Sequence, residues 1–183
     1  QPVVAEDGRG VQIVPPADDY AFKVMTTERS PLRPYHGTDP TWMGDATLTG
    51  VTIQMLTVDG ERAGKGVYLD RIMDCLVQNL WMHEIHRGSA LHVDLVGECN
   101  FVNIHLLGTG CKKTGAPSIA IMGEHANNLR FDRIYTIFPE ARGLEVAGGA
   151  IIYFNDCMWH GHFPFDTVKN ERVRPTIWAN NRA

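Results

Sequence analysis

The chain has 183 residues, 44% hydrophobic and 21% charged, which is the composition of a folded globular protein and excludes a disordered one. This length suits one domain with a sizeable core, so we expect a single unit over residues 1–183. The net charge is −4 and the 17 Lys and Arg residues are scattered, which argues against nucleic acid as a partner. No apolar run approaches the roughly 20 residues of a membrane span.

The N-terminal part predicts a first coil made of two short strands. Residues 10–16 read as a strand that ends at Pro15 and Pro16, and residues 20–24 read as a second strand after this corner. Residues 26–47 are rich in Pro and Gly and show no periodicity, so we interpret them as a long excursion loop. Candidate contact residues on this loop are Tyr35, His36 and Trp42.

The middle of the chain carries two series of short apolar alternations that repeat together, each with the period of two that is typical of a half-buried strand. The first series starts at Val67, Leu91, Ile119 and Leu144. The second starts at Leu56, Leu80, Ile104, Ile134 and Cys157. One longer step follows the polar, Gly-rich residues 108–115, which read as a loop inserted in one coil.

Two strand series in step, with no amphipathic helix between them, predict an all-β fold: a right-handed parallel β-helix, or solenoid, of about five coils. The coils would occupy residues 10–162, and residues 163–183 would form a C-terminal cap or extension with a last strand at 176–179. A leucine-rich repeat would need an LxxLxLxxN pattern, which is absent. A β-sandwich would give closer strand spacing without this register.

The same spacing predicts which side chains stack inside the solenoid. Val77, Phe101, Phe131 and Phe154 would form an aromatic ladder in the core. Asn79 and Asn103 would stack at a turn, since Asn tolerates a left-handed backbone and stacked Asn side chains can hydrogen-bond to one another. Cys75 and Cys99 share this spacing and are interpreted as two buried thiols rather than a disulfide or a metal pair.

On its coil length, its Asn79 and Asn103 positions and its aliphatic stacks, the chain resembles the pectate-lyase-like superfamily of single-stranded right-handed β-helices. Residues 10–22 are also similar to the opening segment of phage tailspikes and related virion β-helices, although no Asp-rich segment or short helix precedes them. The superfamily holds lyases, glycoside hydrolases, epimerases, tailspikes and virion decorations, so the fold leaves the function open. The resemblance to phage members implies a homotrimer.

The outward positions of the second strand series place Trp81, His105 and Tyr135 in one exposed column. Three interpretations stay open for this column. It could form a subunit interface, because Trp and Tyr are enriched there. It could hold sugar rings on its aromatic faces, or it could pack beneath a loop.

Catalytic residues are harder to find in this sequence. Asp59, Glu61, Glu84 and His83 are the weak candidates, and no pair of acids stands out as a hydrolase requires. The histidines do not form an HExxH motif. His160 falls near the position of His83 on a later coil, but other coils intervene, so we expect neither a metal nor another cofactor.

The sequence therefore favours a non-catalytic, trimeric β-helix of a phage virion, either a capsid decoration or a tail-associated domain. Its expected place is the virion surface, with capsid or tail proteins as partners and surface polysaccharide as a candidate ligand. The alternative is a secreted polysaccharide lyase or glycoside hydrolase, or a fragment of one.

Overall fold

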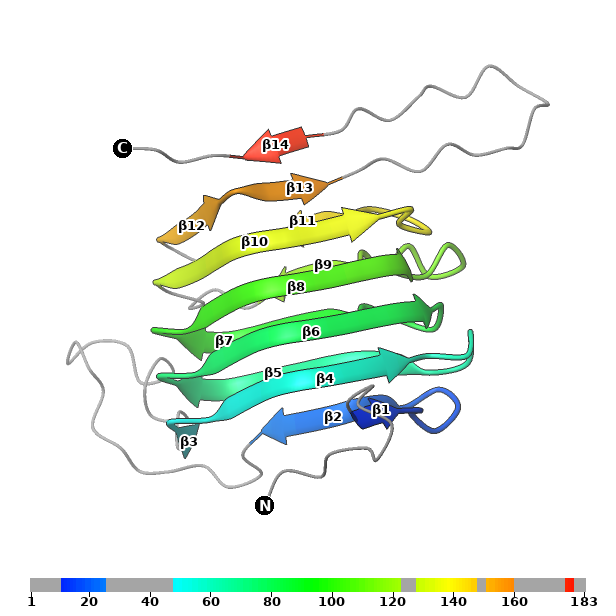
Figure 1. Ribbon diagram of the computed structural model, residues 1–183, viewed down its shortest axis with the longest axis horizontal. Helices are drawn as coiled ribbons and strands as arrows, with labels where there is room; N and C mark the ends of the chain where they lie inside the picture. Colours follow the sequence, from blue (N-terminus) through cyan, green and yellow to red (C-terminus); the bar gives the residue numbers. More distant parts are fainter. Residues whose placement is uncertain (1–10, 26–47, 123–127, 148–150, 160–176, 180–183) are drawn as a thin grey trace.

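The computed structural model describes residues 11–25, 48–122, 128–147, 151–159 and 177–179. These residues form strands and turns with no helix, and the strands stack into a parallel β-solenoid of about four turns (Figure 1). The predicted fold class is confirmed.

Two sheets make up the solenoid, with sheet A in front and sheet B behind it in Figure 1. Sheet A consists of β1 (Val11–Ile13), β4 (Thr52–Asp59), β6 (Leu76–Ile85), β8 (Asn100–Thr109), β10 (Leu129–Ile137), β12 (Ile152–Asn155), β13 (Cys157–Trp159) and β14 (Ile177–Ala179). Sheet B consists of β2 (Tyr20–Met25), β3 (Leu48–Thr49), β5 (Lys65–Met73), β7 (Leu91–Gly97), β9 (Ile119–Met122) and β11 (Leu144–Val146).

The register of the strands matches the two series seen in the sequence. In sheet A, Leu56 pairs with Leu80, Leu80 with Ile104, and Ile104 with Ile134. In sheet B, Val67 pairs with Leu91, Leu91 with Ile119, and Ile119 with Leu144. The extra residues near position 111 form a turn closed by the Cys111 N–H, which donates to the Ala116 carbonyl at 2.9 Å. The insertion therefore leaves the stacking of the strands unchanged.

The core lies between the two sheets and is filled by the predicted stacks. Phe131 lies 4.5 Å from Phe101 and 5.2 Å from Phe154 between ring centroids, and both pairs are stacked. Phe101 and Phe131 are fully buried. A fully buried aromatic side chain of this kind contributes several kcal/mol, so the ladder is a large part of the stability of the fold.

Residues with positive φ bend the strands at corresponding points of successive coils. Met55, Asn79, Asn103 and Arg133 have φ angles of 59°, 53°, 54° and 56° and lie one coil apart. The Asn103 amide donates to the Asn79 side-chain oxygen at 2.8 Å, which confirms the predicted asparagine ladder. At each bend the strand turns, so the residues on both sides of it, such as Val77 and Leu80, are buried in the same core.

Close contact between coils explains the glycine near the start of β5, at position 66. A Cβ atom at Gly66 would lie 1.9 Å from the Ala90 carbonyl oxygen, a distance that no side chain can adopt. The backbone at Gly66 can therefore approach the next coil only because glycine has no side chain.

The two ends of the solenoid agree with the predicted strands. Strands β1 and β2 lie in different sheets on either side of the Pro15–Pro16 corner. Strand β14 pairs with β13 in the antiparallel sense, whereas the other strand pairs of the described residues are parallel. Residues 26–47, with Tyr35, His36 and Trp42, and most of 163–183 lie outside the described residues.

Candidate functional site: the outer face of sheet A

The predicted aromatic column lies on the outer face of sheet A. Trp81 on β6 pairs with His105 on β8, and His105 pairs with Tyr135 on β10. The Trp81 and His105 rings are 5.2 Å apart and almost parallel, with an angle of 2° between them. The His105 and Tyr135 rings are 5.0 Å apart and tilted by 35°.

This stacking decides which ring surfaces remain open to a ligand. His105 lies against one face of the Trp81 indole and Tyr135 lies against His105, so the rings cover one another. Trp81 is 48% exposed, and its paired neighbour on the other side is the small side chain of Thr57. A sugar ring that stacks on an aromatic face would therefore find its place on Trp81 rather than along the whole column.

The environment of His105 favours an uncharged column. Burial between its neighbours lowers the pKa of His105, which favours the neutral imidazole. Its Nε2 atom lies 3.3 Å from the Asn103 side-chain oxygen, so the asparagine ladder orients the ring. The bend of the strand and the aromatic column are thus linked through one side chain.

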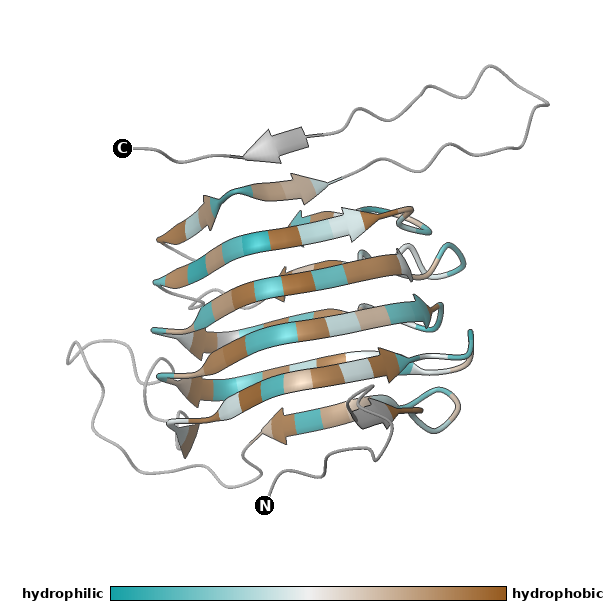
Figure 2. Ribbon diagram, in the orientation of Figure 1, coloured by the Kyte–Doolittle hydropathy of each residue, from teal (hydrophilic) through white to brown (hydrophobic). Residues whose placement is uncertain are grey.

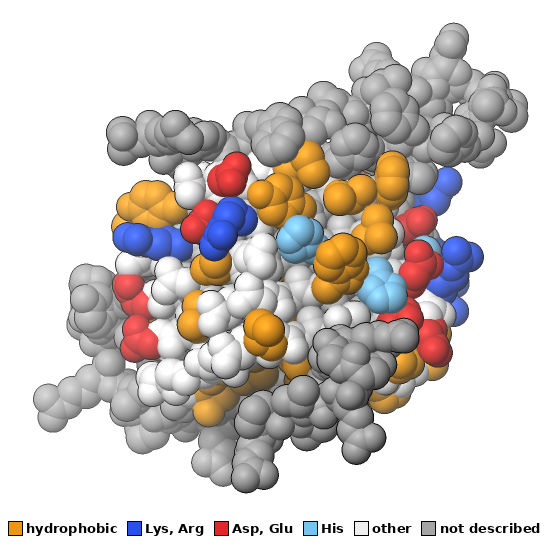
Figure 3. All heavy atoms as spheres, viewed as in Figure 1, with side chains coloured by type: hydrophobic (Ala, Val, Ile, Leu, Met, Phe, Trp, Pro, Cys, Tyr) orange, Lys and Arg blue, Asp and Glu red, His pale blue; other side chains and the backbone are white. Residues whose placement is uncertain are grey.

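A second outward column runs beside the first and changes character along the solenoid. Asp59 and His83 occupy it on β4 and β6, whereas Leu107 and Ile137 occupy it on β8 and β10. The half-buried or exposed apolar residues of the upper strands define what we call the apolar patch: Leu107, Tyr135, Ile137, Phe138 and Met158. Figure 2 shows hydrophobic residues along β8 and β10, and Figure 3 shows hydrophobic side chains gathered over the upper part of this face with charged ones toward its edges.

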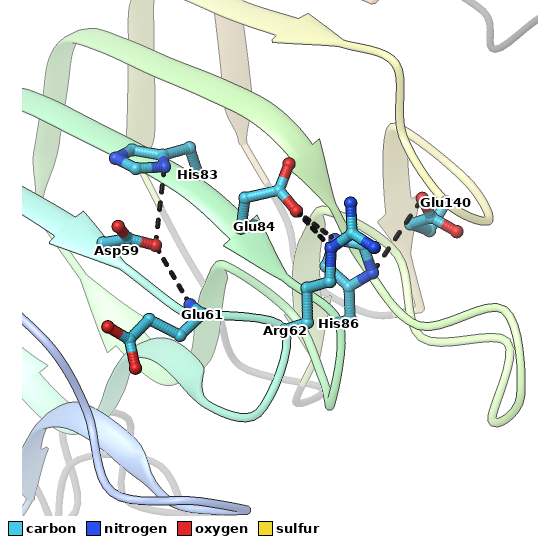
Figure 4. A network of polar contacts seen from close by, with 7 residues as sticks. All are labelled: Asp59, Glu61, Arg62, His83, Glu84, His86 and Glu140. Carbon is cyan, nitrogen blue, oxygen red and sulfur yellow. Dashed lines mark hydrogen bonds and ion pairs between the residues drawn. The ribbon is translucent and has the colours of Figure 1, made fainter.

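A network of polar side chains borders this face where β4 and β6 end (Figure 4). His83 Nδ1 lies 3.6 Å from Asp59 Oδ1, and the Glu61 backbone N–H donates to the same oxygen at 3.0 Å. Arg62 Nε donates to Glu84 Oε2 at 2.8 Å. The four candidate catalytic residues therefore divide into two groups, with Glu84 in a separate ion pair.

The second group contains two residues, His86 and Glu140, that are not among the candidate catalytic residues of the sequence. His86 Nε2 lies 3.4 Å from Glu84 Oε2, and His86 Nδ1 lies 4.0 Å from Glu140 Oε1 (Figure 4). Glu140 follows β10, two coils beyond His86. In the sequence, Glu140 could be linked to His86 only through the repeat, because the turn after β10 corresponds to the turn after β6.

The arrangement contains one ion pair, Arg62–Glu84, and contacts of His83 and His86 with nearby carboxylates. Two carboxylates, Glu84 and Glu140, each lie near one nitrogen of the same imidazole ring. Within the described residues, no group of three or more His, Cys, Asp or Glu side chains could hold a metal ion. His160, the other histidine considered for such a site, lies outside them.

A second aromatic cluster, which the sequence did not predict, lies on sheet B. The Tyr68 ring is 5.3 Å from Tyr20 and 4.9 Å from His92. Burial and the nearby carboxylates of Asp70 and Asp94 raise the pKa of Tyr68 to about 12. Burial also lowers the pKa of His92, so this cluster is uncharged at neutral pH.

The cysteines of the core are thiols, as predicted. The Cys75 backbone N–H donates to Cys99 Sγ at 3.0 Å, and the Cys99 thiol donates to the Gly97 carbonyl at the same distance. All four cysteines are free and buried. The hydrogen bond to Cys99 and burial raise the pKa of the Cys75 thiol, so it stays protonated and unreactive.

The fold and this face define the class of protein: a parallel β-solenoid with a mixed aromatic and apolar outer sheet. No helix of the described residues is long and apolar enough to cross a membrane. A solved structure with a similar fold is ORF18 of Geobacillus virus E2, with a TM-score of 0.59 and 15% sequence identity over 85% of this chain. The chain spans 29% of the length of that phage protein. No family model matches the chain, and no curated protein matches it.

Proposed function

We propose that this chain is a non-catalytic structural module of a phage virion, a β-helix of the pectate-lyase-like type that acts as a homotrimer on the virion surface. The apolar patch on the outer face of sheet A carries this proposal. The similar fold of a phage protein supports it. Capsid or tail proteins would be its neighbours, as a capsid decoration or a tail-associated domain.

The apolar patch is suited to packing between subunits. Leu107 and Ile137 point out of a rigid sheet, at positions where the neighbouring coils carry Asp59 and His83. Exposed apolar patches with a polar border are typical of protein interfaces, and aromatic residues are enriched at their centres. Three solenoids packed side by side would each cover the apolar patch with a neighbour and remove it from water.

The test is the mass of the protein in solution at micromolar concentration, measured by size-exclusion chromatography with light scattering. We expect the mass of three chains for the native protein and of one chain for Ile137→Lys and Tyr135→Asp. Tyr153→Asp is the matched control, because Tyr153 is 45% exposed and lies outside the patch. Circular dichroism would verify that each variant is folded. A native protein that is a clean monomer would overturn the trimer.

Surface polysaccharide is the ligand that the open face of Trp81 favours. The expected result is that Trp81→Ala loses binding to a polysaccharide on a glycan array while the mass in solution stays that of the native protein. Loss of the oligomer instead would assign Trp81 to the interface. No binding to any polysaccharide by the native protein would remove the ligand from the proposal.

The second candidate function is cleavage of a polysaccharide by a hydrolase or a lyase mechanism. It is favoured by the carboxylates of Glu84 and Glu140, which both lie near His86. Both neighbours of Glu84 Oε2 are cationic or protonatable, which makes an ion pair the simpler role. Incubation with acidic and neutral polysaccharides would reveal new reducing or unsaturated ends. Activity that disappears in Glu84→Gln or Asp59→Asn would establish the enzyme and overturn the structural function.

A further inference from the structure

The aromatic column on the outer face of sheet A ends at β6, one coil before β4. Tyr135, His105 and Trp81 occupy one position on β10, β8 and β6, and the residue paired with Trp81 on β4 is Thr57. Neighbouring strands of a sheet lie about 4.8 Å apart. The ring separations of 5.0 and 5.2 Å in the column follow this spacing. A ring placed over Thr57 would therefore stack on Trp81 as Trp81 stacks on His105.

The face of the Trp81 indole that is turned toward β4 is the open end of this column. Trp81 is 48% exposed, whereas His105 and Tyr135 are half-buried. The side chain of Thr57 is too short to cover an indole ring, and it is itself half-buried. The place of a fourth ring, over Thr57 and against Trp81, is therefore open to a ligand.

The rest of the column holds the indole in a fixed orientation. The Trp81 and His105 rings are almost parallel, with an angle of 2° between them. His105 Nε2 lies 3.3 Å from the Asn103 side-chain oxygen, and the Asn103 amide donates to the Asn79 side chain at 2.8 Å. The ring that a ligand meets is already ordered, so a ligand that stacks on it loses little affinity to the ordering of this side chain.

The polar groups beside the open face suit the hydroxyl groups of a sugar. Thr57 carries a hydroxyl group at this place, and Asp59 follows two residues later on the same face of β4, about 7 Å along the strand. Hydroxyl and carboxylate oxygens both accept hydrogen bonds from O–H donors. An aromatic surface with a few polar groups at its edge is the typical composition of a small-molecule site.

The charges at the end of β4 select against an acidic sugar. Asp59 and Glu61 are both carboxylates, and the Glu61 backbone N–H donates to Asp59 Oδ1 at 3.0 Å. His83 lies 3.6 Å from Asp59 Oδ1 and can offset at most one of these two charges. Arg62 donates to Glu84 Oε2 at 2.8 Å instead. The carboxylate of a uronic acid would meet like charge here, which costs affinity.

We propose that the place over Thr57 is a subsite for one neutral pyranose unit of a polysaccharide, which stacks on Trp81 as the fourth ring of the column. The subsite rests on the polysaccharide ligand of the proposed function, and it adds where one sugar unit lies and that this unit is uncharged. A sugar and a large side chain on β4 compete for the same face of Trp81. A ring introduced at position 57 should therefore act like the loss of Trp81.

The test uses matched pairs of ligands: oligosaccharides of glucose, mannose and galactose, and the corresponding oligosaccharides of glucuronate, mannuronate and galacturonate. The native protein is screened against them on an array, and the affinities are then measured by titration calorimetry. We expect binding to at least one neutral oligosaccharide, with its uronate counterpart bound at least about tenfold more weakly. Binding to none of the neutral oligosaccharides, or equal binding of both members of a pair, would overturn the subsite.

The decisive variant is Thr57→Tyr, which puts a ring of the protein on the open face of Trp81, and Thr57→Val is its control of native size. Thr57→Tyr and Trp81→Ala should each weaken binding about tenfold or more. Thr57→Val should leave it unchanged, as should Tyr153→Ala at an exposed tyrosine on β12. Circular dichroism verifies the fold, and Trp81→Ala gives the answer if Thr57→Tyr folds poorly. Native affinity in folded Thr57→Tyr or in Trp81→Ala would refute the stacked sugar.

The mass in solution of the same proteins separates this subsite from the structural role. A native trimer that binds none of the oligosaccharides overturns the subsite and leaves the virion module in place. A native monomer whose sugar binding is lost in Trp81→Ala and in Thr57→Tyr overturns the trimer and supports the subsite.

Discussion

Replacement of Asn103 by alanine tests the physical origin of the bends in the solenoid. Asn103 has a φ of 54°, and its amide donates to the Asn79 side chain at 2.8 Å. A left-handed backbone costs an ordinary residue roughly 1–2 kcal/mol, and Asn pays less of it. The lost hydrogen bond to Asn79 and the lost contact with His105 Nε2 at 3.3 Å together add about 0.5–1.5 kcal/mol. We therefore expect Asn103→Ala to lower the free energy of unfolding by about 2 kcal/mol.

Asn103→Gly separates the two contributions. It loses the same hydrogen bond but adopts the positive φ without strain, so it should be about 1 kcal/mol less destabilised than the alanine variant, even after the cost of glycine flexibility. Urea unfolding followed by circular dichroism measures both variants, and an unchanged m-value shows that the comparison is valid. If Asn103→Gly is as unstable as Asn103→Ala, or less stable, the strain of a left-handed backbone is not the reason for Asn at this position.

Three further predictions concern other positions of the stacks. Met55 has a φ of 59° and is 66% exposed, so Met55→Asn should raise the free energy of unfolding by about 0.5–1 kcal/mol, and no gain in the urea midpoint would contradict this. Phe131→Ala empties the middle of the aromatic ladder and should cost about 3–5 kcal/mol in urea unfolding, with Phe131→Leu costing much less; a cost equal for both would argue against the ladder. Burial lowers the pKa of His105, so the unfolded chain binds this proton more readily and stability falls as the pH drops below about 6.5. His105→Gln should flatten this fall in the melting temperature, and equal slopes for the two proteins would refute it.

The fold was open to prediction because parallel coils in register put equivalent residues at equal spacing. Leu56, Leu80 and Ile104 repeat every 24 residues, and each is paired with the next in sheet A. Burial of alternate residues is a local pattern, and the stacking of coils makes the same pattern recur. Even the inserted loop was visible, since its Gly-rich residues lie outside the repeat.

The bends were only partly visible. Asn79 and Asn103 indicated one column of bends, because Asn is frequent at positions with a left-handed backbone. Met55 and Arg133 adopt the same backbone without any residue-type signal. The neighbouring coils impose the positive φ at these two positions, and a constraint from residues distant in the sequence cannot be predicted from the local pattern.

What the sequence by itself determined is the solenoid: the two strand series, the buried stacks, the buried thiols and the membership of Trp81, His105 and Tyr135 in one column. Only the tertiary structure decided how those rings lie, and therefore that most of their faces are covered by one another. It also brought His86 to Glu140, two coils away, across the glycines of the coil between them. The physical reason is that a repeat specifies which positions stack. The contacts of long polar and aromatic side chains depend in addition on the size of the side chain at the equivalent position of the neighbouring coil.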